Sequence, residues 1–395
     1  MSIASGQSII RRLASSTPGR WLRTAVENRA LKGYEEFLSG APRRRALLAY
    51  LVRPLMLPPR MRERVVFSNR GIAQEIPRAL NELGYSVDIV NFTNQTFRPS
   101  GEYDLFVGHG GTNFSRLADE IGRGVPAVYF STGLHWRDSN VREATRLYEA
   151  TLRTGKLFPA ERAIHDDEDG ATRRAVGIIC LGNEEAAKSY RLFPNVVAID
   201  NAAYPLGAAP GIERNWGDAR HRFLFFSGGG NIHKGLDRLL EAFDGTELTL
   251  HVCQRIEPEF ERAYATLLRD RPNIVVHGFV GMRTPHFRGL ASQCAWNIHP
   301  TCAEGQPGSV LECMAHGLIP VMPDAANIDY EDCGVRLADC SVETLRSVAR
   351  ALTSMSTEEC IRRSSAATAS VARRYSPERF RESFKGAIQA LLDRA

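Results

Sequence analysis

Two glutamates eight positions apart, Glu304 and Glu312, flank a turn whose sequence is Glu-Gly-Gln-Pro-Gly-Ser. The apolar run 295–298 before this turn predicts the end of a buried strand, and residues 309–316 predict a short helix after it. The first amides of a helix have no partners within the helix, and the helix dipole adds positive charge there. Such a junction can bind a phosphate, with the two carboxylates placed to hold sugar hydroxyls beside it.

Ser309 and Glu312 also fit a purely structural pattern. In a capping box, a serine at the start of a helix and a glutamate three residues later satisfy each other's backbone amides. Glu312 would then bind the Ser309 amide rather than a ligand. Both interpretations are open from the sequence.

A second candidate phosphate site lies in residues 227–234, Ser-Gly-Gly-Gly-Asn-Ile-His-Lys. The apolar run 222–226 predicts a strand before it, and the spacing of residues 235–243 predicts an amphipathic helix after it. Glycines let the backbone approach a phosphate, and Lys234 supplies positive charge. The segment is not a P-loop, because G-x-x-x-x-G-K-[ST] is absent. The alternative is a surface lysine beside a flexible turn.

Strands and helices alternate along most of the chain. Strands are expected at 64–67, 86–90, 103–107, 127–130, 175–180, 196–199, 222–226, 247–252, 273–276, 295–298 and 318–322. Helices are expected at 72–83, 140–153, 235–243, 309–316, 342–353, 357–372 and 377–394. This alternation favours α/β domains with parallel, doubly wound sheets, whose ligands bind beyond the carboxyl ends of the strands.

Length and composition favour two domains of ordinary size, each with its own core. We expect a basic helical N-terminal extension at 1–62, a first Rossmann-like domain at 63–204 and a linker at 205–220. A second Rossmann-like domain is expected at 221–375 and a C-terminal helix at 376–395.

Positive charge is concentrated near the N-terminus. Residues 1–64 carry 13 Lys/Arg and 4 Asp/Glu, whereas the whole chain has a net charge of only +5. The basic and apolar stretch Arg43–Leu57 predicts peripheral contact with an anionic membrane, and the alternative is a helix packed on its own domain. No aromatic–basic module for nucleic acid is present, so we expect no nucleic-acid partner.

Several common segment types are missing from the sequence. No run of 18 apolar residues predicts a transmembrane helix, and the N-terminal residues do not resemble a signal peptide. The eight cysteines include no C-x-x-C pair, which favours reduced, mostly buried thiols. These features favour a cytoplasmic protein that can contact the inner face of the membrane.

The segment around the two glutamates closely resembles the E-x7-E signature of the retaining glycosyltransferases of family 4, which have the GT-B fold. About a dozen positions agree in order, from the acidic residue through Pro-Gly-Ser and Leu-Glu-Cys-Met-Ala to Ile-Pro-Val. Residues 227–234 and the following helix resemble the Lys-Gly-x-Asp segment of the family, whose lysine pairs with the donor diphosphate. The resemblance implies two Rossmann-like domains that face each other across a cleft.

The resemblance also implies the roles of individual residues. Glu304 and Lys234 would act at the reacting centre, with Glu304 beside the donor sugar and Glu312 on the ribose hydroxyls. The nucleotide sugar would be bound by Gly228, Gly229, Lys234, Gly305, Gln306, Pro307, Gly308, Ser309, Val310 and Glu312. One departure is Gly229, because many relatives carry an arginine at this place as a second diphosphate ligand.

The first half matches the family more loosely. Asp-Leu-Phe-Val-Gly-His, ending at His109, resembles a segment of relatives that carries a histidine, which implies a catalytic role for His109 and an acceptor-side position for Gly110. Relatives often place another active-site histidine just before Gly133, where this chain has Thr132 and, slightly later, His135. We assign His135 to the acceptor side as well, with a structural histidine as the alternative.

The sequence therefore predicts a retaining glycosyltransferase that moves a sugar from a nucleotide diphosphate sugar to a hydroxyl acceptor. We expect a carbohydrate or lipid-linked carbohydrate acceptor, as in bacterial-type cell-surface polysaccharide or glycolipid synthesis. No tightly bound cofactor and no metal site are expected, because no Asp-x-Asp motif follows a strand. The alternatives are a non-catalytic partner of GT-B fold in carbohydrate assembly and a GT-B isomerase or phosphorylase.

Overall fold

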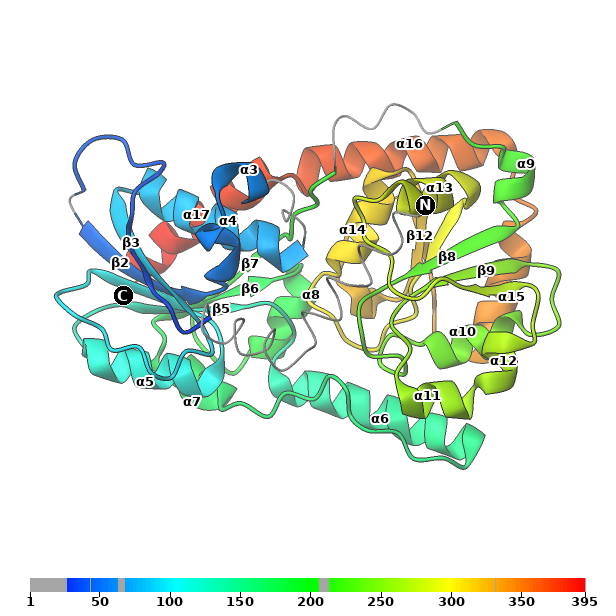
Figure 1. Ribbon diagram of the computed structural model, residues 1–395, viewed down its shortest axis with the longest axis horizontal. Helices are drawn as coiled ribbons and strands as arrows, with labels where there is room; N and C mark the ends of the chain where they lie inside the picture. Colours follow the sequence, from blue (N-terminus) through cyan, green and yellow to red (C-terminus); the bar gives the residue numbers. More distant parts are fainter. Residues whose placement is uncertain (1–26, 43, 63–67, 206–212, 331, 395) are drawn as a thin grey trace, which may run out of the picture.

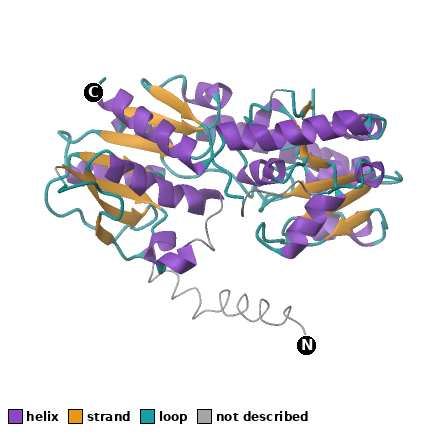
Figure 2. Ribbon diagram, turned by 90° about the horizontal axis from the view of Figure 1, so that it is seen from above, coloured by secondary structure: helices purple, strands orange, loops and turns teal. Residues whose placement is uncertain are grey.

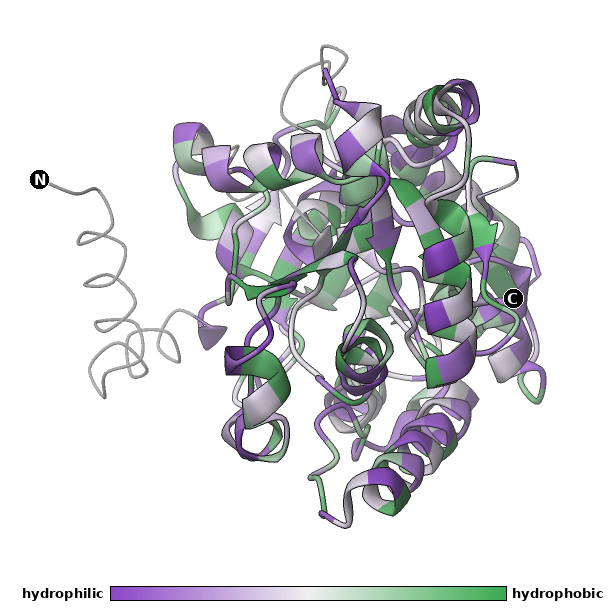
Figure 3. Cartoon of the chain, turned by 90° about the vertical axis from the view of Figure 1, so that its right-hand side faces the viewer, coloured by the Kyte–Doolittle hydropathy of each residue, from purple (hydrophilic) through white to green (hydrophobic). Residues whose placement is uncertain are grey.

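Two β-sheets with helices packed on both faces form the two lobes of the computed structural model (Figure 1). The structure describes residues 27–42, 44–62, 68–205, 213–330 and 332–394. Seen from above, the lobes lie side by side, with helices around the strands of each (Figure 2). Hydropathy follows this layering, because the strands are mainly hydrophobic and the outer helices carry hydrophilic stretches (Figure 3). The predicted fold class, two doubly wound α/β domains, is confirmed.

The first sheet has the strand order β1-β3-β2-β4-β5-β6-β7 among the described residues. All neighbours are parallel except β1 and β3. The strands are β1 (Leu31–Tyr34), β2 (Arg44–Tyr50), β3 (Tyr85–Asn91), β4 (Leu105–Gly108), β5 (Ala127–Ser131), β6 (Gly177–Leu181) and β7 (Val196–Ile199).

The second sheet is parallel throughout and has the order β10-β9-β8-β11-β12-β13 within the same described part of the chain. Its strands are β8 (Arg222–Phe226), β9 (Thr249–Cys253), β10 (Ile274–Val276), β11 (Trp296–Ile298), β12 (Ile319–Met322) and β13 (Val335–Arg336). Parallel strands are buried on both faces and therefore read as continuous apolar runs, which is why most of them could be located from the sequence.

The helices that connect and cover the strands follow the apolar periodicity of the chain. Those of the first half are η1 (Arg53–Met56), α3 (Pro59–Arg62), α4 (Ser68–Glu82), α5 (Gly111–Ile121), α6 (Trp136–Thr154), α7 (Glu168–Arg174), α8 (Glu184–Ala187) and η3 (Lys188–Tyr190). Those of the second half are α9 (Trp216–Ala219), α10 (Leu236–Phe243), α11 (Pro258–Ala263), α12 (Ala265–Arg269), α13 (Pro285–Gln293), α14 (Gly308–Ala315), η4 (Asp324–Ala326), α15 (Val342–Leu352), α16 (Thr357–Arg374) and α17 (Pro377–Leu392).

The structure corrects the predicted helical extension at 1–62. Residues 44–50 form β2, an interior strand between β3 and β4, and its apolar side chains lie in the core. The guanidinium of Arg45 binds the Asp88 carboxylate at 2.6 Å, and that of Arg44 lies over the Tyr85 ring at 4.3 Å. These basic and apolar side chains are already used inside the domain, so residues 44–57 do not form a membrane-surface helix.

Other sequence predictions fall outside the described residues. These are the strand predicted at 64–67, the first 26 residues of the predicted extension, Arg43 and the 206–212 part of the linker. Among the residues that the structure does describe, no helix is long and apolar enough to span a membrane.

The lobes are joined in two ways that the predicted domain boundaries did not include, through α6 and through the connection between α16 and α17. Helix α6 starts in the first domain and runs along the second (Figure 1), where Ala150 joins the apolar core and Arg153 pairs with Asp237 and Glu241. At the C-terminus, α16 packs on α14 of the second domain, whereas α17 returns to pack on α4 of the first. The last helix is therefore a part of the first domain's core.

Candidate functional site between the two domains

A cavity of about 460 Å³ lies between the domains, at the carboxyl ends of the parallel strands. The loops after β8, β10 and β11 form its second-domain wall, and the first domain contributes Ser68, Asn69, Thr132 and Arg162. Most of the residues predicted to bind a nucleotide sugar line this cavity: Gly228, Gly229, Lys234, Gly305, Gln306, Pro307, Gly308 and Ser309. Glu304, predicted to be catalytic, lines it as well. The two candidate phosphate sites of the sequence thus face one space.

Lys234 and Glu304 meet at the floor of this cavity. The Lys234 ammonium forms an ion pair with Glu304 Oε1, which also accepts a hydrogen bond from the Thr301 hydroxyl at 3.1 Å. Nε2 of the fully buried His299 lies 3.5 Å from the same oxygen. Burial lowers the pKa of Lys234 well below its usual value, whereas the adjacent carboxylate favours the charged ammonium. A buried cation is thus held at the glycine-rich loop.

Helix α14 points its N-terminus at the cavity, as predicted. It begins at Gly308, and its N-cap residue, Pro307, makes no side-chain cap hydrogen bond. Helix α4 of the first domain begins opposite, close enough that a Cβ on Gly308 would lie 3.3 Å from the Ser68 hydroxyl oxygen. The first amides of both helices therefore add positive potential to one end of the cleft.

Glu312 and Val310 do not line the cavity in this structure. Both are buried, and Glu312 Oε1 accepts a hydrogen bond at 2.6 Å from the backbone N–H of Tyr204, which lies where the chain leaves the first domain. The capping-box interpretation is not supported, because the structure records no side-chain cap at this helix. Burial raises the pKa of the Glu312 carboxyl to about 7, although the Tyr204 amide and Arg283 act in the opposite direction.

Gln306 and Gly305 hold the two domains together. The Gln306 side chain donates a hydrogen bond to Asp200 Oδ1 and accepts one from the backbone N–H of Asn201, each at 2.7 Å. A Cβ on Gly305 would lie 2.6 Å from the Leu181 carbonyl oxygen and 2.7 Å from that of Thr132. The loop after β11 therefore sits directly on the first domain, and the Gln306 amide is engaged there rather than free for a ligand.

His109 and Gly110 lie in a second cavity of about 350 Å³, which shares Thr132, Arg162, Glu304 and Gly305 with the first. Nδ1 of His109 lies 2.9 Å from the Phe130 carbonyl oxygen, and burial lowers the pKa of the ring, so the neutral form predominates at neutral pH. The predicted acceptor-side histidine is thus next to the predicted donor site, with Glu304 and Arg162 on the boundary.

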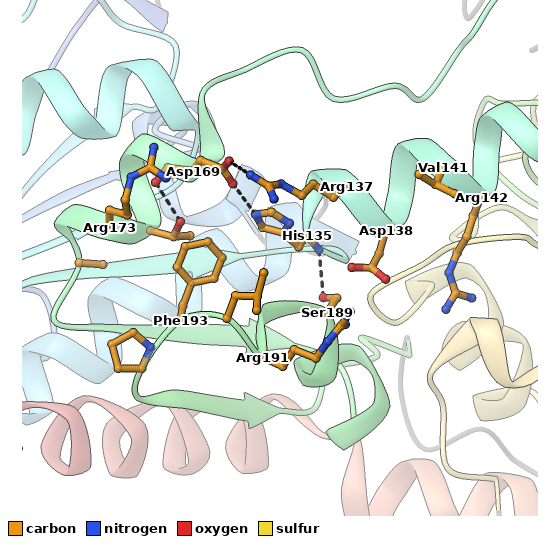
Figure 4. A pocket seen from close by; sticks show the side chains of 14 residues that line it. His135, Arg137, Asp138, Val141, Arg142, Asp169, Arg173, Ser189, Arg191 and Phe193 are labelled. Atoms are coloured by element: carbon orange, nitrogen blue, oxygen red, sulfur yellow. Dashed lines mark hydrogen bonds and ion pairs between the residues drawn. The ribbon is translucent and has the colours of Figure 1, made fainter.

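His135 is not part of this arrangement, which corrects its predicted acceptor-side position. It lines a separate cavity (Figure 4), where its Nε2 lies 3.0 Å from Asp169 Oδ1 and its backbone N–H donates to the Ser189 hydroxyl. His135 is the N-cap residue of α6 and does not line the cavity of His109, which the two preceding residues, Gly133 and Leu134, do line. The structural alternative fits its position.

Sequence reasoning missed the residues that the first domain contributes. Ser68 and Asn69 begin α4, and Arg162 lies in the irregular segment between α6 and α7. No periodicity, glycine pattern or motif marks Arg162, so only the tertiary structure places it in the cleft. Within the described ranges, no group of three or more His, Cys, Asp or Glu side chains could hold a metal ion.

No protein-family model matches the chain, and no curated protein matches it in sequence. Solved structures do. TarM of S. aureus is 14% identical over 73% of this chain (TM-score 0.51), but the chain spans only 54% of the length of TarM. A sucrose-phosphate synthase from Thermosynechococcus elongatus is 12% identical, with 90% of this chain and 100% of that chain covered (TM-score 0.59).

HepE of Anabaena, solved with UDP and glucose, is 13% identical, with 88% of this chain and 100% of that chain covered (TM-score 0.54). These structures are glycosyltransferases of the GT-B class. At such low identities the likeness shows the fold alone: the chain has the GT-B fold, with two facing α/β domains.

Proposed function

We propose that this chain is a retaining glycosyltransferase that moves a sugar from a nucleotide diphosphate sugar to a hydroxyl acceptor, in the synthesis of a cell-surface polysaccharide or glycolipid. The main support is the interdomain cavity in which the Lys234–Glu304 pair faces the start of α14. A GT-B neighbour that was solved with UDP and glucose supports the same substrate class.

The proposed roles follow from charge. When the bond between the sugar and the diphosphate breaks, negative charge grows on the leaving diphosphate, and groups arranged beforehand to meet that charge lower the barrier. Lys234 and the first amides of α14 are such groups. In this proposal Glu304 lies beside the transferred sugar and the cavity of His109 takes the acceptor, which the position of Glu304 at the boundary of the two cavities supports.

Thermal shifts with UDP-, GDP-, ADP- and dTDP-sugars test this function, because a ligand that binds only the native state raises the melting temperature. We expect one nucleotide to stabilise the protein, and purified protein to hydrolyse or transfer the matching donor. NMR of the product then reports whether the anomeric configuration is retained. Binding without turnover of any donor would favour the non-catalytic partner, and no stabilisation by any nucleotide would contradict the proposal.

We expect Glu312→Gln to weaken nucleotide binding roughly 10- to 100-fold at pH 8. This corresponds to the loss of a hydrogen bond to a charged group, which contributes about 1.5–3 kcal/mol to binding. The proposed partner is the ribose, for which the ionised carboxylate is the stronger acceptor. Because the pKa of Glu312 is about 7, wild-type affinity should rise between pH 6 and pH 8, whereas that of the variant should stay flat. Calorimetric titration at both pH values measures this.

Stability should behave differently. A carboxyl group whose pKa is raised on folding stabilises the native state fully below its unfolded pKa and loses that contribution as pH rises through about 7. Above pH 7, Glu312→Gln therefore should not lower the melting temperature, since the Gln carbonyl can still accept from Tyr204. The matched control is Glu343→Gln, an exposed position on α15 of the same domain. Wild-type affinity in Glu312→Gln would restrict Glu312 to its contact with Tyr204.

A further inference from the structure

The segment that follows α6 crosses the cleft and docks on the glycine-rich loop of the second domain. The Glu161 carboxylate accepts a hydrogen bond at 3.1 Å from the backbone N–H of Asn231, which follows the three glycines. The backbone N–H of Arg162 donates in turn to Glu143 Oε1 of α6 at 2.7 Å, and the Glu143 carboxylate is almost fully buried. Arg162 is therefore held by its own backbone and by its neighbour, independently of its guanidinium.

The side chain of Arg162 lies directly against this loop. Gly230 has a φ of +87°, and a Cβ there would lie 2.9 Å from Cγ and 3.2 Å from Cδ of Arg162. The absence of a side chain at Gly230 thus lets the arginine approach. Arg162 lines the same cavity as Gly228, Gly229 and Lys234, and its positive charge contributes, after burial, to lowering the pKa of Lys234.

The two cations Lys234 and Arg162 differ in whether a carboxylate pairs with them. The Lys234 ammonium already faces the Glu304 carboxylate. Among the described residues, no carboxylate forms an ion pair with the Arg162 guanidinium, although the side chain is exposed to the cleft. A diphosphate that enters this cavity brings more negative charge than a lysine paired with a glutamate can neutralise. Arg162 supplies a further positive charge beside the glycine-rich loop, whereas Arg283, which also lines the cavity, donates a hydrogen bond to the Tyr204 carbonyl oxygen at 3.0 Å.

We propose that Arg162, which reaches across from the first domain, is a second cationic ligand of the donor diphosphate. This inference rests on the proposed function and adds a residue from the other domain to it. A guanidinium can bind two phosphate oxygens at once, in a fork geometry that an ammonium cannot provide. Because Arg162 also lines the His109 cavity, donor binding through Arg162 links the donor domain to the acceptor side.

Arg162→Lys and Arg162→Met separate the charge of this residue from its packing on Gly230. Lys keeps an aliphatic stem and a positive charge, whereas Met keeps only the apolar body. Calorimetric titrations with UDP and with inorganic pyrophosphate measure binding. We expect Arg162→Met to bind both at least 10-fold more weakly than wild type, and Arg162→Lys to fall between the two, because Lys keeps the charge but cannot form the fork. Arg142→Met, on the exposed face of α6 outside both cavities, is the control and should bind normally.

The opposite results are equally clear. Wild-type affinity in Arg162→Met would overturn the proposal. Equal losses in the Lys and Met variants would also overturn it, because the positive charge that Lys keeps would then contribute nothing to binding. Failure of the underlying function looks different, because wild-type protein would then bind neither probe and the inference would fall with it. If wild-type protein binds UDP and Lys234→Ala does not, an unaffected Arg162→Met removes Arg162 alone.

Discussion

Lys234→Ala is expected to lower donor turnover, measured as kcat/KM, by at least 10-fold. The ammonium is held beside the glycine-rich loop and lines the interdomain cavity, where the proposed function puts the leaving diphosphate. Losing one charge-assisted contact to a developing charge has an effect of this size. Steady-state kinetics with the donor chosen by the thermal screen measures it.

Circular dichroism must show that the variant is folded, because Lys234→Ala leaves the Glu304 carboxylate without its ion-pair partner. The matched control is Lys188→Ala, whose side chain is 64% exposed and pairs with Glu185 on the surface. Kinetics equal to wild type in a folded Lys234→Ala protein would remove Lys234 from the site.

The largest effect on stability is expected from Phe384→Ala in the last helix. Phe384 is fully buried against the first domain, where its ring centroid lies 6.0 Å from that of Phe130 in β5. Truncating a buried phenylalanine costs about 3–5 kcal/mol through lost burial and the cavity left behind. For domains of this size that corresponds to a fall of roughly 6–20 °C in melting temperature. Differential scanning calorimetry of the full chain measures it.

Gln389→Ala is the control for this change, because it lies on the exposed face of the same helix. It should leave the melting temperature within about a degree, since surface substitutions usually cost less than about 0.5 kcal/mol. Similar melting of Phe384→Ala and wild type would contradict the view that α17 completes the core of the first domain.

Most of the second domain could be predicted from the sequence because its signals are local. Strands such as 222–226 are continuous apolar runs, and the glycine-rich loop and the start of α14 follow directly from residue types. The strand β2 was missed for the opposite reason. Its apolar residues follow arginines, as in an interfacial helix. The side chains that bind Arg45 are those of Asp88 and Tyr103, which lie 43 and 58 positions further along the chain.

The same distinction applies to the site. The lining residues of the loops after β8 and β11 could be found through motifs, whereas residues 281–284, after β10, were not predicted. The Glu312–Tyr204 contact joins positions 108 residues apart, and the local Ser309–Glu312 spacing suggested a cap instead. Arg162 lies in an irregular segment without periodicity, and its importance follows only from the approach of Gly230. His135 was placed in the site by its position in sequence, which does not determine where the first turn of α6 directs it.

The return of α17 to the first domain has a consequence for the order of synthesis on the ribosome. The sheet of the first domain is complete at Ile199, but the helix that covers part of it ends at Leu392. At translation rates of about 5–20 residues per second, roughly 10–40 s pass between the two. During that interval Phe130, Ile179 and Leu181 lack the part of their cover that α17 provides, so this apolar face stays partly open until translation is nearly finished.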